Sequence, residues 1–261
     1  MFSPRIVGET ARLKSQAELE AMRHAGKIHA RTVALLRGAV APGVTTGELD
    51  ALAEAAIREA GARPSFKGYR DYPATICTAA NDVIVHGIPA PADTLDEGDL
   101  LAVDLGVCWE GYHADGAFTV GVGQIDDDAK RLLAVTREAL ELGIAQVRPG
   151  NTIRDIAAAV QGHVEAAGFS VVRALVGHGI GSEMHEPPQV PNYVEGSGGV
   201  YAVELVPGMT LAIEPMVNAG GPDVVQDDDG WTVRTRDGSR SAHFEHTVAV
   251  TEDGCWILTA P

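Results

Sequence analysis

The sequence contains a stretch that occurs twice and that decides the fold. Residues 41–49 read APGVTTGEL, and residues 148–156 read RPGNTIRDI, so that proline, glycine, threonine, an acidic residue and an aliphatic residue stand in register. The match continues along the chain, because Gly61 falls opposite Gly168. Such self-similarity indicates a chain built from two similar halves.

Each copy carries the signals of a helix. Thr45 stands three residues before Glu48, and Thr152 stands three residues before Asp155, which is typical of a capping box at a helix start. Apolar residues follow at helical spacing in both copies. The glycine that closes each copy suits the left-handed position after a last helical turn.

Two further helices and a set of strands are expected around these copies. The helices precede the copies, at about residues 16–37 and 128–147. After each helix pair the hydrophobic period changes from 3.6 to 2 residues, which predicts strands. The strands are expected at residues 74–85, 100–108, 116–122, 170–176, 209–218, 231–236 and 242–250. Asp-Gly steps at residues 229–230, 237–238 and 253–254 predict hairpin turns between the late strands.

The order helix, helix, strands, then the same again, predicts an α+β fold. We expect two halves, about residues 10–123 and 124–261, related by a pseudo-twofold axis. Their strands should share one curved, mainly antiparallel sheet with the helices on its outer face. A length of 261 residues suits a single domain that spans residues 1–261.

The composition argues against several classes of protein. The net charge is −16 and no cluster of Lys and Arg offsets it, so DNA binding is not expected. No apolar stretch approaches the ~20 residues that cross a bilayer. The first residues, MFSPRIVGETARLKSQAELE, lack the apolar centre of a secretory signal, so a cytoplasmic protein without membrane contact is expected. The 3 cysteines lack CxxC spacing, which argues against a disulfide framework or a thiolate zinc finger.

Four carboxylates stand in or beside expected strands, where an isolated charge is costly. They are Asp104 in LLAVDLGV, Asp115 in DGAFTVGV, Glu214 in MTLAIEPMV and Glu245 in SAHFEHTVAV. A buried carboxylate becomes protonated, pairs with a base or binds a cation. None of these segments contains Lys or Arg, so a bound metal is the expected partner.

Three histidines outside the expected helices strengthen this interpretation. His86 follows NDVIV, and His178 and His185 belong to GHGIGSEMHEPP. Glycines at alternate positions around His178 let a backbone approach a site closely, whereas their spacing does not match the GxGxxG pattern of dinucleotide binding. A lone histidine is more often structural than a ligand, and the histidines on the expected helices keep that interpretation.

These residue types together predict metal-assisted hydrolysis. Four carboxylates and one imidazole suit two divalent ions of the Mn, Fe, Co or Zn kind. Two such ions a few ångströms apart can activate water and stabilise a tetrahedral intermediate. The sequence contains no GxSxG nucleophile motif that would favour a serine hydrolase.

Five motifs in order resemble the type I methionine aminopeptidase family, whose members have the pita-bread fold. They are NDVIVHGIP, the Asp104 and Asp115 pair, GHGIGSEMHEPPQV, AIEPMV and SAHFEHTVAV, and the resemblance extends from about residue 10 to the end. It implies that five residues hold two metal ions: Asp104, Asp115, His178, Glu214 and Glu245. It also implies that Asp115 and Glu245 bridge the two ions.

The resemblance also assigns residues around the substrate. His86 and His185 match histidines that contact it, and Glu214 matches a carboxylate that also handles the proton of the attacking water, so these three are the expected catalytic residues. A pocket for the methionine side chain is expected from six residues: Phe66, Tyr69, Tyr72, Cys77, Met184 and Trp231. Met184 stands where many members have an aromatic residue and Phe66 where some have a cysteine, but both keep the wall apolar.

The reaction and its setting are implied in the same way. The enzyme would remove the initiator methionine from N-terminal methionyl peptides and nascent chains whose second residue is small and uncharged. It would use two divalent ions (cobalt, manganese, iron or zinc), act as a monomer in the cytoplasm and contact the ribosome transiently. No large insertion separates Val190 from Met209 and the helical core begins close to the first residue, which favours type I over longer relatives.

Two rival functions share this fold. A proline-directed aminopeptidase or dipeptidase would use equivalent ligands, although those families generally carry a sizeable N-terminal domain. A catalytically inactive binding module, for example at the ribosome, should have lost ligands, and all five are present. Assays of methionyl and Xaa-Pro peptides, with and without metal, separate these functions.

Overall fold

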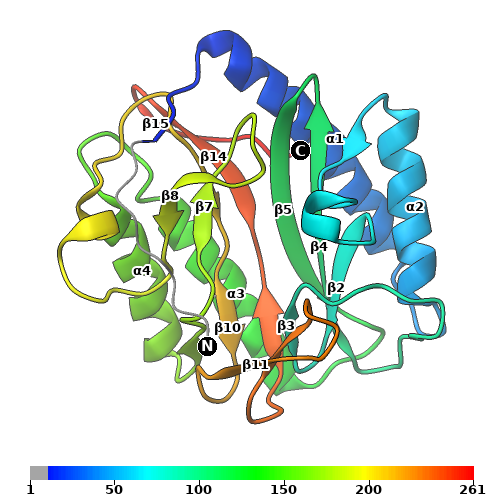
Figure 1. Ribbon diagram of the computed structural model, residues 1–261. Helices are drawn as coiled ribbons and strands as arrows, with labels where there is room; N and C mark the ends of the chain where they lie inside the picture. The colour runs from blue at the N-terminus through cyan, green and yellow to red at the C-terminus, as the bar shows by residue number, and fades with distance from the viewer. Residues whose placement is uncertain (1–10) are drawn as a thin grey trace.

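Two similar halves, each a pair of helices followed by strands, make up the computed structural model, which describes residues 11–261 (Figure 1). The first half begins with α1 (Gln16–Ala39) and α2 (Thr46–Glu59), and the second with α3 (Asp127–Ile144) and α4 (Ile153–Ala166). The expectation that the chain has no secretory signal depends largely on residues 1–10, which lie outside the described residues. No helix in residues 11–261 is long and apolar enough to cross a membrane.

The helices start and stop where the repeated stretch predicts. Thr45 Oγ1 accepts a hydrogen bond from the Glu48 backbone N–H at 3.2 Å, and Glu48 Oε2 accepts one from the Thr45 N–H at 2.8 Å. In the second copy, the Thr152 N–H donates to Asp155 Oδ2 at 2.7 Å. The glycine after each helix has a positive φ, 77° in the first copy and 80° in the second. The capping and termination signals are therefore confirmed.

The strands of both halves are short, apart from one long hairpin. The first half contains β1 (Arg63–Pro64), β2 (Ile76–Ala80), β3 (Val83–Val85), β4 (Leu100–Trp109) and β5 (Tyr112–Gly121). The second half contains β6 (Ser170–Val171), β7 (Gly177–Gly179), β8 (Glu186–Val190), β9 (Thr210–Ile213), β10 (Met216–Asn218), β11 (Val224–Gln226), β12 (Val233–Thr235), β13 (Ser241–His243), β14 (His246–Thr251) and β15 (Gly254–Ile257). Two 3₁₀ turns, η1 (Tyr69–Asp71) and η2 (Gly199–Ala202), lie between strands.

Every strand pair in the described residues is antiparallel, and the pairs form four groups. The groups have the orders β1-β4-β2 with β5 on β4, β13-β10-β6, β11-β12-β3, and β15-β14-β9-β7-β8. The two largest groups meet where β5 passes the start of β14: the Glu245 N–H donates to Ala117 O at 3.0 Å. The Thr119 hydroxyl donates to His243 O at 2.7 Å beside this junction. The strands thus curve from one half into the other.

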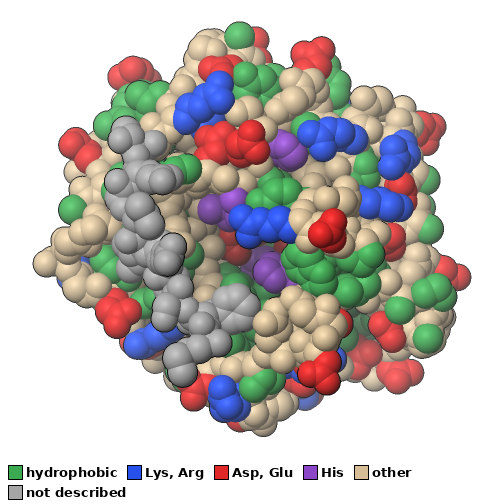
Figure 2. Space-filling view, viewed as in Figure 1, with side chains coloured by type: hydrophobic (Ala, Val, Ile, Leu, Met, Phe, Trp, Pro, Cys, Tyr) green, Lys and Arg blue, Asp and Glu red, His purple; other side chains and the backbone are tan. Residues whose placement is uncertain are grey.

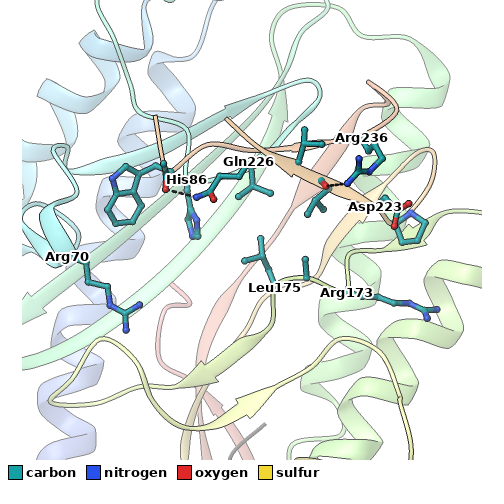
Figure 3. A pocket seen from close by; sticks show the side chains of 14 residues that line it. Arg70, His86, Arg173, Leu175, Asp223, Gln226 and Arg236 are labelled. Carbon is teal, nitrogen blue, oxygen red and sulfur yellow. Dashed lines mark hydrogen bonds between the residues drawn. The ribbon is translucent and has the colours of Figure 1, made fainter. Parts of the chain in front are cut away.

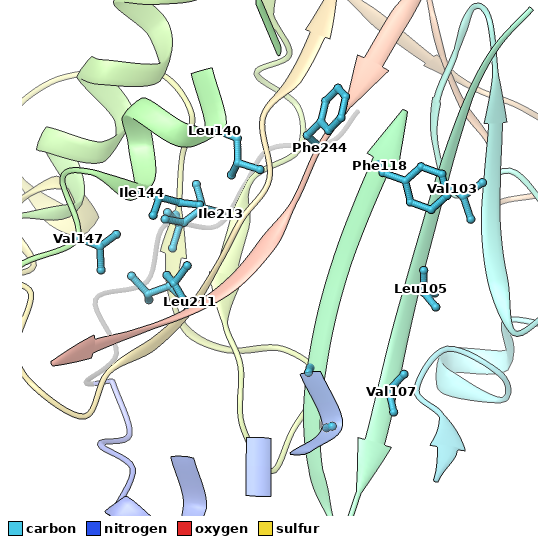
Figure 4. Close-up of a cluster of buried hydrophobic side chains, with 14 of the residues drawn as sticks. Val103, Leu105, Val107, Phe118, Leu140, Ile144, Val147, Leu211, Ile213 and Phe244 are labelled. Carbon is cyan, nitrogen blue, oxygen red and sulfur yellow. The ribbon is translucent and has the colours of Figure 1, made fainter. Parts of the chain in front are cut away.

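The helices cover one side of these strands and bury the main apolar core against them. α1 packs on β4 and β5, while α3 packs on β9, β10 and β13. Figure 4 shows this core, with Phe118 and Leu105 in the first half of the chain and Ile144 close to Ile213 in the second half. Gly143 lets α3 approach its neighbours, because a Cβ there would lie 2.9 Å from a Val160 methyl group. The opposite side of the strands is left open for a site.

Several strand boundaries differ from those predicted. The segment 74–85 is divided into β2 and β3 by a turn with Asn81 at φ 55°, and the segment 170–176 is a strand only at β6. The Asp-Gly step at 237–238 is not a hairpin turn, because β12 pairs with β3 and β11 while β13 pairs with β10. The steps at 229–230 and 253–254 do connect paired strands. Local alternation of apolar residues identified strands but could not identify their partners.

Candidate active site

The five candidate metal ligands come from both halves and line one cavity of about 140 Å³. Asp104 lies on β4 and Asp115 on β5, while His178 lies on β7. Glu214 directly follows β9, and Glu245 directly precedes β14. The structure therefore brings together residues that are far apart in the sequence.

The register of the long hairpin explains how two of these carboxylates meet. In the pairing of β4 with β5, Asp104 lies directly opposite Ala117, and Asp115 lies directly opposite Gly106. Residues two apart on a strand share a face, so both carboxylates project from the same face of the hairpin. The backbone bond from Glu245 to Ala117 then places the third carboxylate beside them.

The donor atoms at the centre of the cavity are arranged as a cation site would require. Asp115, His178 and Glu245 each offer one ligand atom within 4.8 Å of the others, and all three are buried. Glu214 Oε1 lies 3.6 Å from His178 Nε2. Among the described residues, Asp104 Oδ1 and Glu245 Oε1 are buried without a hydrogen-bond partner. In residues 11–261 no lysine or arginine pairs with any of the four carboxylates, so the uncompensated charge fits divalent cations.

The cost of holding these carboxylates together is visible in their pKa values. Burial raises the pKa of Asp104 to about 7. Burial, together with the charges of Glu245 and Asp104, raises the pKa of Asp115 well above its ordinary value. Burial and neighbouring carboxylates raise the pKa of Glu214 in the same way. A divalent ion reverses this effect, because its charge favours the ionised form of each ligand.

His178 is oriented as an imidazole ligand. Its Nδ1 lies 2.8 Å from the Gly179 carbonyl oxygen, which can only accept, so Nδ1–H is the donor. Burial lowers the pKa of His178 to about 4, which keeps the ring neutral. The lone pair on Nε2 therefore faces the carboxylates, the arrangement that outer hydrogen bonds impose on metal-binding histidines.

His86 and His185 line the same cavity from different elements. His185 lies beside His178 with ring centroids 4.1 Å apart and the rings tilted by 37°, and its Nδ1 lies 2.9 Å from the Tyr69 hydroxyl oxygen. His86 sits directly after β3 with φ 61°, a left-handed conformation that a non-glycine residue adopts at a cost. The centroids of its ring and the Trp231 ring lie 6.4 Å apart, and the two rings are in an edge-to-face arrangement. Both imidazoles are thus held at the border of the carboxylate cluster.

The six residues predicted to hold the methionine side chain all line this cavity: Phe66, Tyr69, Tyr72, Cys77, Met184 and Trp231. Tyr72 is fixed by its hydroxyl, which lies 3.0 Å from the Ile76 and Gly87 carbonyl oxygens. The centroids of its ring and the Trp231 ring lie 5.0 Å apart. Cys77 is buried opposite Asp104 on neighbouring strands. One wall of the cavity is therefore apolar and the other carries the carboxylates.

Three residues near the site were not singled out from the sequence. His243 is buried with Nε2 4.0 Å from Glu214 Oε2, and this nitrogen has no hydrogen-bond partner in the described residues. Arg70 lines the cavity mouth, and His113 Nδ1 lies 2.8 Å from the Ser65 hydroxyl oxygen. The spacing of His243, two residues before Glu245 in SAHFEH, could have indicated it, because that spacing places both side chains on one face of an extended chain.

The fold and the carboxylate-lined cavity are those of a metal-dependent peptidase, and comparison with known proteins agrees. The model of metallopeptidase family M24 matches residues 20–252, so the chain belongs to this family. A methionine aminopeptidase of Clostridium perfringens is 48% identical over 247 residues, which cover 95% of this chain and 98% of the relative. A methionine aminopeptidase 1 of Bacillus subtilis is 48% identical over 246 residues, 94% of this chain and 98% of the relative.

Solved structures give the same result. The crystal structure of a methionine aminopeptidase from Thermotoga maritima has a TM-score of 0.93 and 43% identity, and covers 97% of this chain and 100% of its own. A prolidase from Pyrococcus horikoshii has a TM-score of 0.75 at 23% identity, but this chain covers only 63% of it, so the likeness shows the fold alone. The resemblance to type I methionine aminopeptidases and the pita-bread fold are confirmed, and metal dependence follows from the family.

Proposed function

We propose that this protein is a hydrolase that removes the N-terminal methionine from peptides and nascent chains. The observation that carries the proposal is the two-sided cavity. Buried carboxylates and His178 form one wall, and an apolar pocket that includes Phe66, Cys77 and Trp231 forms the other. An unbranched apolar side chain fits the apolar pocket, and the peptide bond that follows this residue then lies beside the carboxylates and His178.

Two divalent ions at the carboxylate wall complete the proposed site. Asp104, Asp115, His178, Glu214 and Glu245 would hold these ions. Cobalt, manganese, iron and zinc all suit this oxygen and nitrogen donor set. Such ions supply Lewis acidity, which activates water and stabilises charge on a carbonyl oxygen.

The surrounding side chains position the substrate and move protons. We assign His185 Nε2–H as the donor to the scissile carbonyl oxygen as charge develops there, which requires the Tyr69 hydroxyl to donate to Nδ1. His86, fixed next to Trp231, contacts the substrate on the other side of the cavity. Glu214 accepts the proton of the attacking water and passes it on to the leaving amine.

The wider setting is proposed on the same basis. Residues of both halves line the cavity, which supports a single catalytic domain over residues 1–261. The family resemblance supports a cytoplasmic monomer that contacts the ribosome transiently. Gel filtration and cell fractionation test these expectations directly.

A narrow site for the second residue is expected beside His86, and this expectation leads to a specific substrate prediction. Peptides with Gly, Ala, Ser, Thr, Pro, Val or Cys after methionine should be hydrolysed, while bulky second residues should fail. Release of methionine from Met-Ala and Met-Leu peptides measures the difference. Comparable rates on the two peptides would contradict the proposed specificity.

One experiment tests the activity and its metal dependence together. The protein is dialysed against a chelator, and single metals are restored at controlled concentrations. Methionine release from Met-Gly peptides should vanish and return with metal, while Xaa-Pro peptides remain intact throughout. Preferential cleavage of Xaa-Pro peptides would instead assign the protein to the proline-directed enzymes.

A further inference from the structure

A second cavity, of about 960 Å³, adjoins the one that holds the carboxylates. Both are lined by Arg70, His86 and Trp231, so they meet at the mouth of the proposed active site. The larger volume falls within the range of about 300–1,000 Å³ that ligand sites occupy. A peptide whose first residue lies in the smaller cavity can therefore continue into the larger one. We refer to the larger cavity as the arginine groove.

The far part of the arginine groove has an apolar base and an exposed strand edge. Leu175 and Val224 pack on a buried cluster that contains Val233. Strand β11 pairs only with β12 in the described part of the chain, so its other edge has no strand partner there. A free strand edge can pair with an extended peptide through backbone hydrogen bonds. The groove thus offers the features that bind an extended chain without regard to its sequence.

The charge of the arginine groove is opposite to that of the whole molecule. Arg70, Arg173 and Arg236 line it together with one acidic side chain, Asp223, although the net charge of the protein is −16. Figure 3 shows Arg173 and Arg236 at the end of the groove away from Arg70. Lys and Arg side chains also stand beside the histidines around the central hollow in Figure 2. The groove is therefore a local site of positive potential.

The guanidinium groups at the far end retain capacity to bind a ligand. Arg236 Nη2 donates to Val224 O at 3.1 Å, and no other N–H group of this side chain has a partner among residues 11–261. Arg173 lies 3.5 Å from Glu165, but both side chains are exposed, so this ion pair is weak and exchangeable. Within residues 11–261 Arg236 forms no ion pair with an acidic residue. A carboxylate of the peptide would satisfy these donors.

We propose that the arginine groove binds the substrate chain beyond its second residue and that Arg173 and Arg236 select substrates with Asp or Glu in this part. The inference rests on the proposed function, because the smaller cavity must hold the N-terminal methionine for the chain to enter the groove in this direction. An extended chain advances ~3.3 Å per residue, so successive side chains pass along the groove from His86 toward the arginines. Acidic side chains meet guanidinium groups there, whereas Lys and Arg are repelled.

The test uses peptides that share Met-Ala-Ser and continue with three Glu, three Ser or three Lys residues. For the wild type, kcat/KM should be about 2- to 30-fold higher for the Glu than for the Lys peptide, the range that two exposed ion pairs give. The difference should lie mainly in KM and should shrink at high salt. In R173Q/R236Q the Glu and Lys values should converge while the Ser peptide is cleaved as by the wild type.

A matched control separates the groove from overall charge. R137Q/R154Q removes the same charge from exposed positions of α3 and α4 and should retain the full difference. Equal kcat/KM for the Glu and Lys peptides, or an unchanged difference in R173Q/R236Q, would overturn the proposal. Binding of the same peptides, labelled at their C-termini, to chelator-treated protein gives a second readout. Tighter binding of the Glu peptide that R173Q/R236Q abolishes would support the groove. Failure of the enzyme to hydrolyse the Ser peptide would count against the proposed function but not against the groove.

Discussion

Lys14 provides a buried charge on which the arrangement of the His185 segment depends. Its Nζ lies 2.5 Å from Glu186 Oε2, and the two side chains are only 2% and 6% exposed. Lys14 also donates to the Arg12 carbonyl oxygen at 2.9 Å. Burial lowers the pKa of Lys14, while the hydrogen bond to Glu186 acts in the opposite direction. The pair thus joins the segment before α1 to the residue that follows His185.

Replacing Lys14 with Met should leave the Glu186 carboxylate buried without its counter-charge. Removal of one partner of a buried ion pair costs about 3–5 kcal/mol. The lower end applies here, about 3 kcal/mol, because Glu186 Oε1 still accepts a hydrogen bond from the Glu183 N–H at 3.2 Å. Urea unfolding at a fixed metal concentration measures the loss in the free energy of unfolding.

Two further variants serve as controls for the K14M prediction. The double variant K14M/E186L removes both charges, so it should be more stable than K14M, since apolar replacement of a whole buried pair is close to neutral. K67M breaks the exposed pair of Lys67 with Glu54, 2.7 Å apart, and should lose less than about 1 kcal/mol. The reasoning would be refuted if K14M unfolded with nearly wild-type stability, or if K14M/E186L were less stable than K14M.

Three other substitutions test separate parts of the account. C77S should raise KM by about 10-fold or alter the side-chain preference without changing metal content, because a small polar change in an apolar pocket affects binding; loss of metal would contradict this placement. G26A should destabilise the protein, because a Cβ at Gly26 would overlap the Leu258 carbonyl oxygen; an unchanged melting temperature would argue against the close contact of α1 with the C-terminal segment. Y69F keeps the aromatic ring in the methionine pocket, so it should keep its metals and KM but lower kcat by about 2- to 12-fold, since His185 loses the hydrogen bond that fixes its tautomer; a purely KM effect would show that the Tyr69 hydroxyl contacts the substrate instead of His185.

Features encoded by neighbouring residues could be predicted from the sequence. The capping boxes at Thr45 and Thr152 depend on side chains three residues away, and both are formed. Asp104 and Asp115 were recognisable because each is a charged residue within an otherwise apolar strand, and a two-residue turn explains why they meet. Local chemistry and alternation therefore predict the helices, the two strands that form the long hairpin and the candidate ligands.

Features that depend on contacts between distant segments were not predicted. The Lys14–Glu186 pair joins residues 172 positions apart, and nothing near Lys14 in the sequence indicates a buried partner. Strand β7 consists of Gly177–Gly179, which lacks the β-branched residues that identify strands, yet it pairs on both sides. The arginine groove combines segments around residues 173 and 236 with η1, and only the folded chain brings these segments together.

The central claim is that His178 holds metal while the neighbouring His185 acts on the substrate, within one metal-dependent site. The direct measurement is bound metal and kcat for H178A and H185A over a metal titration, with methionine release from a Met-Ala peptide as the assay. H178A should lose metal affinity, and added metal should partly restore its activity. H185A should keep its metals and its KM but lose about 10²- to 10³-fold in kcat, the scale of one oxyanion donor, and added metal should not restore it. Loss of metal by H185A, or full metal occupancy in H178A at low metal concentration, would contradict the account.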